Sequence, residues 1–251
     1  MGTGADTLPW LVVFSLLGSV GGVAGAALLL LFPEPTRRSL LPSLLSYATG
    51  TLLGAAFLAM IPKGVAQAPA VNVSATVLAG IVGFFLMEKI VVWRHCHAAD
   101  CEVHGQAGPL ILVGDALHNF VDGLVIAAAF VTSIPLGIAA SLAVIAHEVP
   151  QEVGDFAILL DSGYSRRRAF ALNLLSSLTT LPGALAAYFY LATVGHVVPY
   201  ILALSAASFI YVAMADLVPT LHRTTGLTHT LRQLLFILAG IATIAFFRFH
   251  H

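Results

Sequence analysis

Two apolar stretches decide what this chain can be: GDALHNFVDG (Gly114–Gly123) and AHEVPQEVGD (Ala146–Asp155). A carboxylate at the bilayer centre costs about 2.5–3.5 kcal/mol even on lenient insertion scales. Left unpaired, the acidic residues of the two stretches would together cost on the order of 10 kcal/mol. Such groups persist where they pair, face water or hold a cation. The acids here are Asp115, Asp122, Glu148, Glu152 and Asp155, and they alternate with the metal donors His118, Asn119, His147 and Gln151.

The composition indicates a membrane protein. Hydrophobic residues make up 59% of the chain and charged residues 9%, whereas soluble domains carry about 25% charged residues. A net charge of −1 argues against a nucleic-acid partner and leaves the lipid bilayer as the expected surroundings. Residues 1–251 read as a single all-α transmembrane domain without a soluble part. We predict eight spans, at about Pro9–Phe32, Leu40–Pro62, Val73–Trp93, Pro109–Val131, Ile134–Leu160, Arg168–Thr193, Val198–Val218 and Leu231–Phe249.

The basic residues predict the orientation. Of the 11 Lys and Arg residues, all except Lys63 and Arg248 fall in or beside the odd-numbered loops. The positive-inside rule then places those loops in the cytoplasm and both termini outside. No basic region precedes the first apolar stretch, so we expect it to span the membrane and not to be a cleaved signal. The predicted location is the plasma membrane, or the inner membrane if the source is bacterial.

Helical periodicity gathers the polar residues of each stretch on one face. At 100° per residue, Asp115, His118, Asn119 and Asp122 fall within about 100°. His147, Glu148, Gln151, Glu152 and Asp155 fill an arc of about 140° on the fifth span. Two such faces turned toward each other would supply imidazole, carboxylate and amide ligands. That mixture suits Zn²⁺, Fe²⁺ or Mn²⁺ better than Ca²⁺ or an alkali ion.

Three other interpretations use the same residues. The polar groups could form a buried hydrogen-bonded lock between helices, or they could relay protons in a carrier of a non-metal solute. HExxH on a helix marks zinc peptidases, but the sequence here is HEVPQ, with Gln151 in place of the second histidine. An intramembrane metallohydrolase is therefore disfavoured, and we predict no enzyme activity. Pro150 removes a backbone hydrogen bond to the carbonyl of Ala146, which predicts a locally opened helix beside the site.

The two motifs resemble those of the ZIP family of divalent-metal transporters. The resemblance rests on HNFVDG in the fourth segment and on HEVPQEVGDFAILLDSGYSRRRAFALNLLSSLT through the fifth and sixth, and it extends over nearly the whole chain. It is closest to the branch whose fifth segment reads HExPHE. The resemblance implies uptake of Zn²⁺, and also Fe²⁺, Mn²⁺ or Cd²⁺, into the cytoplasm. It implies an eight-helix bundle in which spans 1–3 and 6–8 form inverted repeats around spans 4 and 5. It also implies homodimers and an elevator-like movement.

Motif position implies the ligands. His118, Asn119 and Asp122 would come from the fourth span, and His147, Glu148 and Gln151 from the fifth, with Glu152 as the final acid of that motif. Asp115 would orient His118 or guide ions, while Asp155 and Asp216 would lie on the route. Two departures from the family pattern stand out. Gln151 replaces a histidine, and Thr180 stands where some members have a glutamate that helps to hold a second ion. We therefore expect one strong site.

The predicted cytoplasmic loop 94–108 contains a second group of metal donors. The thiols and imidazoles are His95, Cys96, His97, Cys101 and His104. Soft and borderline ligands of this kind favour weak metal capture. The spacing of the two cysteines is not that of a structural zinc knuckle, and a solvated loop without metal is the competing interpretation. No other cofactor is expected.

Overall fold

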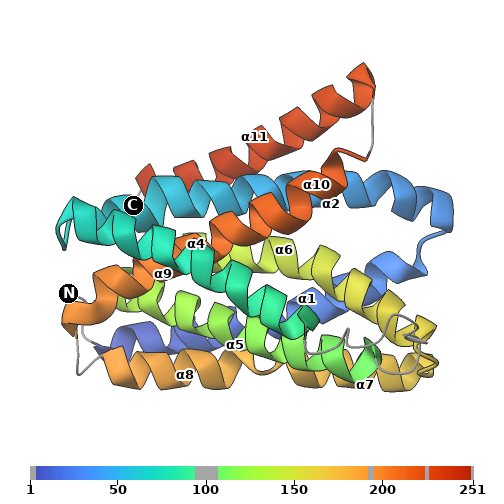
Figure 1. The fold of residues 1–251 in the computed structure, drawn as a ribbon, viewed down its shortest axis with the longest axis horizontal. Helices are drawn as coiled ribbons and strands as arrows, with labels where there is room; N and C mark the ends of the chain where they lie inside the picture. Colours follow the sequence, from blue (N-terminus) through green and yellow to red (C-terminus); the bar gives the residue numbers. More distant parts are fainter. Residues whose placement is uncertain (1–3, 94–106, 192–194, 224–225, 250–251) are drawn as a thin grey trace.

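Eight helical rods, each long and apolar enough to cross a membrane, make up the described part of the chain. The computed structural model describes residues 4–93, 107–191, 195–223 and 226–249 (Figure 1). The eight predicted spans and the all-α fold are confirmed. Five rods are single helices: α1 (Gly4–Leu31), α4 (Ala70–Trp93), α5 (Ala107–Thr132), α6 (Ile134–Asp161) and α11 (Leu227–Phe249). The second rod consists of α2 (Glu34–Gly54), η1 (Ala55–Met60) and α3 (Ile61–Val65), and the sixth of α7 (Arg166–Ser177) and α8 (Thr180–Leu191). The seventh consists of α9 (Val198–Val212), η4 (Ala213–Leu217) and α10 (Val218–Leu221), and the short turn η3 (Gly195–Val197) precedes it.

The second and seventh rods each change helix type just before a proline. Each contains a π-helical turn, η1 or η4, that ends two residues before a proline, Pro62 or Pro219. A proline lacks the backbone N–H and crowds the preceding turn, and a π turn absorbs the misfit. Pro150 behaves differently, because α6 continues through it without a break. The expectation of an opened helix at Pro150 was therefore wrong.

The rods divide into two groups by how closely they pack. Group I comprises α1, α5, α6, α7 and α8, in which α5 packs on α8 and α1 on α6. Group II comprises α2, α4, α9, α11 and the short elements joined to them, in which α2 packs on α11 and α4 on α9. These are the most extensive long-range pairings of each group, and Figure 1 shows group II above group I. Exchanging spans 1 with 6, 2 with 7, 3 with 8 and 4 with 5 reproduces the same pairings, as an inverted repeat requires.

Glycine allows the closest approaches inside both groups. Between α2 and α11, a Cβ on Gly50 would overlap the backbone oxygen of Ile237, and one on Gly240 that of Tyr47. Between α5 and α8, Gly123 and Gly183 make the same kind of reciprocal contact with backbone oxygens of the facing helix. Small residues at such crossings let membrane helices gain van der Waals contact, because lipid supplies no hydrophobic drive between helices. Gly123 thus fixes how α5, which carries the first motif, packs on its neighbour.

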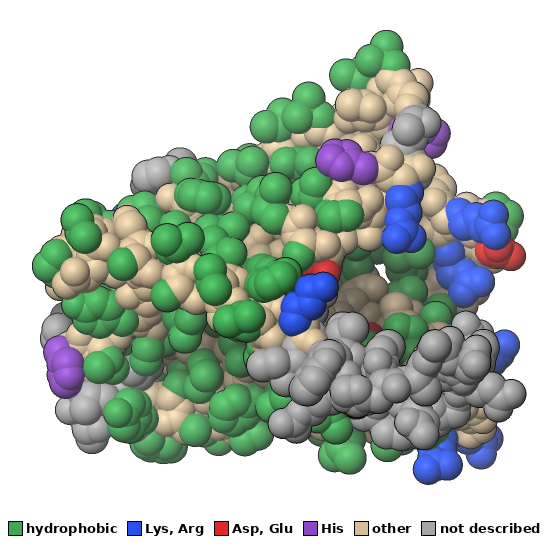
Figure 2. Space-filling view, viewed as in Figure 1, with side chains coloured by type: hydrophobic (Ala, Val, Ile, Leu, Met, Phe, Trp, Pro, Cys, Tyr) green, Lys and Arg blue, Asp and Glu red, His purple; other side chains and the backbone are tan. Residues whose placement is uncertain are grey.

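The basic side chains gather toward one end of the rods. In Figure 2 the blue Lys and Arg side chains lie mainly in the right half of the view, where α1 passes to α2 and α6 to α7 in Figure 1. Green apolar side chains are spread over the left half of this face and over the upper rod. The charge asymmetry predicted from the loops is therefore also an asymmetry of the folded molecule. We call this end the basic end.

Candidate metal centre

Four side chains from α5 and α6 bring their donor atoms together inside group I. His118 and Asp122 are one turn apart on α5, and His147 and Glu148 are adjacent on α6. One ligand atom from each lies within 4.8 Å of the others. We call these four residues the cluster. The helical arcs predicted from the sequence therefore do face each other across the α5–α6 contact.

The spacing of the donors suits a small metal ion. The Nε2 atoms of the two histidines are 3.1 Å apart. His147 Nε2 lies 3.2 Å from Asp122 Oδ2 and 3.5 Å from Glu148 Oε1. The corresponding distances from His118 Nε2 are 3.7 and 3.8 Å. Bonds of about 2.0–2.1 Å in tetrahedral geometry place neighbouring ligands about 3.3 Å apart, so the cluster needs little adjustment to enclose Zn²⁺.

The hydrogen bonds around the cluster orient His147 and leave the carboxylate oxygens of the cluster available to a metal ion. His147 Nδ1 donates to the carbonyl oxygen of Ala143 at 3.0 Å, which turns the Nε2 lone pair toward the cluster. Within the described residues, no hydrogen-bond donor reaches any of the four carboxylate oxygens of Asp122 and Glu148. No Lys or Arg in the described ranges forms an ion pair with them. Two buried acids with neither a hydrogen-bond donor nor a Lys or Arg partner among the described residues call for a cation between them.

A cavity connects the cluster with the basic end. It has a volume of about 920 Å³, and His118 and His147 are among its lining residues. His118 keeps 21% of its side chain exposed, while the other three cluster side chains are at most 1% exposed. The cavity also reaches Ile111 near the start of α5 and Ile158 near the end of α6. Its walls come from both groups, since Leu41, Leu45 and Val212 belong to group II. Figure 2 shows the surface hollowed near the blue side chains.

Asp115 forms a separate network one turn closer to the basic end. Its Oδ2 accepts a hydrogen bond from Ser176 at 2.5 Å. Its Oδ1 accepts from Asn119 at 2.9 Å and from Gln151 at 3.4 Å. Asn119 Oδ1 lies 2.9 Å from the hydroxyl of Thr180, which can donate to it. The amide nitrogens of Asn119 and Gln151 thus donate to Asp115.

The remaining predicted residues lie in different places. Glu152 is fully buried but does not join the cluster, and it lines another pocket of group I. Asp155 and Asp216 line the cavity that leads from the cluster, Asp155 buried and Asp216 exposed. The five donors of the 94–108 loop, namely His95, Cys96, His97, Cys101 and His104, lie outside the described residues.

Ser176 was missed by the sequence reasoning, and Thr180 was noticed only as the place of an absent glutamate. Both belong to a polar stripe along the sixth span, Asn173, Ser176, Ser177 and Thr180, at helical spacing. All four are buried. Hydroxyl side chains are common in membrane helices and often bond to their own backbone. The stripe extends over two helical turns, and this length was the feature of the sequence that could have indicated a buried polar network.

Comparison with known proteins gives matching results. The family model described as ZIP Zinc transporter matches residues 93–248. Zinc transporter ZIP13 of Pongo abelii is 32% identical over 94% of this chain and 78% of its own length. Zinc transporter SLC39A7 of Mus musculus is 30% identical over 83% of this chain and 63% of its own length. Zinc transporter ZIP4 of Mus musculus is 49% identical over 45% of this chain, but only 17% of that protein is covered.

Proposed function

Because the chain belongs to the ZIP zinc transporter family, a family of transporters and not of enzymes, we propose that it carries Zn²⁺ across its membrane through the cluster between α5 and α6. One observation supports the proposal above all. Four metal-binding side chains converge at the inner end of a cavity, and the two acids among them have no hydrogen-bond donor in the described part of the chain. Two imidazoles and two carboxylates form a ligand set for borderline divalent metals. The same ligand set also suits Fe²⁺, Mn²⁺ and Cd²⁺, which are the secondary substrates.

The ligands of the transported ion are His118, Asp122, His147 and Glu148. They replace part of the hydration shell at mid-membrane, where a bare cation would otherwise be costly. The amide nitrogens of Asn119 and Gln151 donate to Asp115, and their amide oxygens can add to the ligand set while the ion passes. Asp155 and Asp216 attract the ion along the cavity. Glu152 lies apart from this path, and a ligand role for it requires a different arrangement of the helices.

Transport requires that the cluster open alternately to the two sides. The division into groups I and II suggests how, because the cavity lies along their boundary. Movement of group I as a rigid body against group II would carry the cluster from one side to the other. Such a movement would leave the close glycine crossings inside each group unchanged. This is an elevator-like mechanism.

The charge asymmetry sets the direction. With the basic end in the cytoplasm, the cavity is an exit toward the cytoplasm and both termini are extracytoplasmic. The protein is a multi-pass membrane protein, and we place it in the plasma membrane, or in the inner membrane of a bacterium. A homodimer would cover part of the exposed apolar surface of the rods. Residues 94–108 would collect the released ion through their thiols and imidazoles.

Uptake by proteoliposomes tests the proposal. Purified protein is reconstituted around a fluorescent metal chelator, and Zn²⁺, Fe²⁺, Mn²⁺, Cd²⁺ and Co²⁺ are added in turn. We expect uptake of Zn²⁺ that is lost in His118→Ala and retained in His229→Ala, a matched change of an exposed histidine on α11. Proton movement without metal uptake would instead support a proton-coupled carrier of a non-metal solute.

A further inference from the structure

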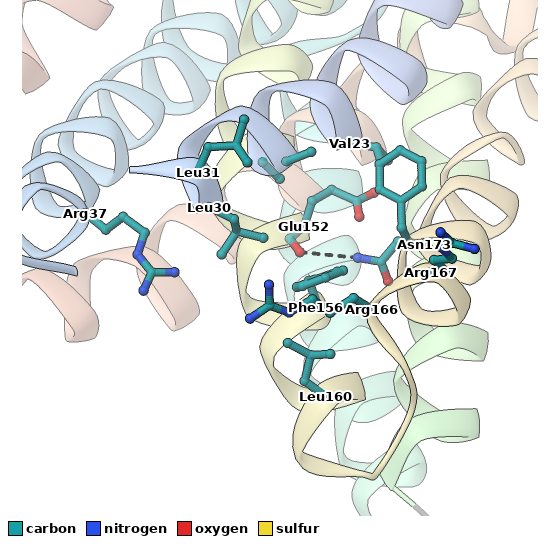
Figure 3. A pocket seen from close by; sticks show the side chains of 13 residues that line it. Val23, Leu30, Leu31, Arg37, Glu152, Phe156, Leu160, Arg166, Arg167 and Asn173 are labelled. Carbon is teal, nitrogen blue, oxygen red and sulfur yellow. Dashed lines mark hydrogen bonds between the residues drawn. The ribbon is translucent and has the colours of Figure 1, made fainter. Parts of the chain in front are cut away.

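A second cavity, lined mainly by group I, lies apart from the cluster, near the basic end. It has a volume of about 440 Å³ and is bounded by the last turns of α1 and α6 and the first turns of α7. Its walls are largely apolar, with Leu30, Leu31, Phe156, Leu160 and Phe170 among the lining side chains (Figure 3). None of the four cluster residues lines it. We call it the arginine pocket, because three arginines complete its lining.

The three arginines have no acidic partner in the described part of the chain. Arg37 comes from the first turn of α2, and Arg166 and Arg167 from the first turn of α7. The adjacent arginines, Arg38 and Arg168, do have interaction partners. Arg38 pairs with Glu34, and the guanidinium of Arg168 lies 4.8 Å from the centre of the Tyr164 ring. Three unpaired guanidinium groups around one pocket are a ready site for an anion.

Among the described residues, one acid lines the arginine pocket, and it does not cancel this charge. Glu152 is fully buried, whereas Arg166 and Arg167 are exposed and Arg37 is partly exposed. Figure 3 shows Glu152 beside Asn173, whose amide donates to the Glu152 backbone oxygen at 3.3 Å. The opening of the pocket is therefore positively charged, and the walls deeper inside are apolar.

We propose that the arginine pocket binds an anionic phospholipid of the leaflet at the basic end. Basic pockets between membrane helices on the cytoplasmic side hold lipid head groups, and guanidinium forks match phosphate oxygens. The lipid phosphate lies against Arg37, Arg166 and Arg167, and its acyl chain lies along the leucine and phenylalanine walls. Free phosphate has the same head-group chemistry but would leave those walls uncovered.

The position of Arg37 adds a consequence. Arg37 belongs to α2 of group II, whereas Arg166 and Arg167 belong to α7 of group I. A head group held by arginines from both groups ties them together in the arrangement seen here. A ligand that contacts one arrangement of two bodies better than another shifts the population toward it. Bound lipid therefore fills the pocket and also stabilises this arrangement of the two groups.

Native mass spectrometry and thermal unfolding of the full-length protein in detergent test the site. Phosphatidylglycerol, phosphatidylcholine and inorganic phosphate are added separately to the unchanged protein and to two pairs of substitutions. Arg37→Gln with Arg166→Gln removes two pocket arginines. Arg38→Gln with Arg168→Gln removes the same charge from neighbouring positions. A third variant, Leu30→Trp, fills the apolar wall and keeps every charge.

We expect phosphatidylglycerol, but not phosphatidylcholine, to be retained and to raise the unfolding temperature. The pocket pair should weaken binding by about tenfold or more, the neighbouring pair by less than about twofold, and Leu30→Trp should also reduce it. Equal losses in the two pairs would overturn the proposal, because they would indicate general charge attraction. Full displacement by millimolar inorganic phosphate, or unchanged binding in Leu30→Trp, would likewise rule out the lipid.

Discussion

The cluster and the Asp115 network lie one helical turn apart, and each contains a buried aspartate of α5, yet the hydrogen bonding of the two aspartates is opposite. Asp115 accepts hydrogen bonds from three side chains on three helices. Asp122 and Glu148 accept none from the residues that the structure describes. A buried carboxylate that accepts hydrogen bonds from neighbouring helices holds those helices together. A buried carboxylate without hydrogen-bond donors either binds an ion or lowers the stability of the folded protein. Residue type alone does not separate a binding site from a structural lock, but the donors around each acid do.

The largest effect should come from the cluster itself. Asp122→Asn should lower Zn²⁺ uptake by more than about 100-fold, because a charged ligand of the ion is lost. The same change should raise the unfolding temperature of the metal-free protein, since a buried carboxylate without a donor disappears. Uptake assays and thermal unfolding without metal measure the two effects. A lower unfolding temperature together with normal uptake would make Asp122 part of a lock.

Asp115 should show the reverse pattern. Asp115→Ala leaves the hydroxyl of Ser176 and the amides of Asn119 and Gln151 without their acceptor. We expect a loss of about 2–4 kcal/mol in stability, while Zn²⁺ binding by the folded protein changes less than in Asp122→Asn. Thermal unfolding and isothermal titration check this. A full loss of Zn²⁺ binding in a stable Asp115→Ala protein would place Asp115 in the ion site.

Acid should act on the cluster more than on the network. Carboxylates and imidazoles bind a metal only when deprotonated, so protons compete with Zn²⁺ and uptake falls as the pH falls. We expect uptake at pH 5 to be about tenfold or more below that at pH 7. The rise in unfolding temperature that Zn²⁺ produces should shrink over the same range. Uptake that stays constant between the two pH values would contradict the proposed ligand set.

The smallest effect is expected at Thr180. Thr180→Val removes the hydroxyl beside Asn119 Oδ1 and keeps the volume of the side chain. We expect a loss of about 1 kcal/mol in stability and uptake within about twofold of the unchanged protein. Thermal unfolding and zinc uptake measure both. A loss of uptake comparable to that of Asp122→Asn would move Thr180 from the network to the ion path.

Much of the fold and the centre of the site could be predicted from the sequence. The long apolar runs gave all eight spans, because the bilayer requires about 20 such residues per helix. The i, i+4 spacing of His118 and Asp122 predicted a shared face, and the structure brings both into the cluster. Glu148 and Glu152 show where periodicity fails. They lie one turn apart on α6, yet Glu148 joins the cluster and Glu152 faces the arginine pocket.

The sequence by itself determined that this chain crosses a membrane eight times and carries metal ligands inside it, because apolar length and buried charge are local properties of a helix. It also predicted which end is basic, because the charges follow the loops. Only the tertiary structure decided which acids remain without donors. Ser176 and Thr180 reach Asp115 and Asn119 from about 60 residues away. Such partners follow from helix packing, and packing, not residue type, separates the ion site from the lock beside it.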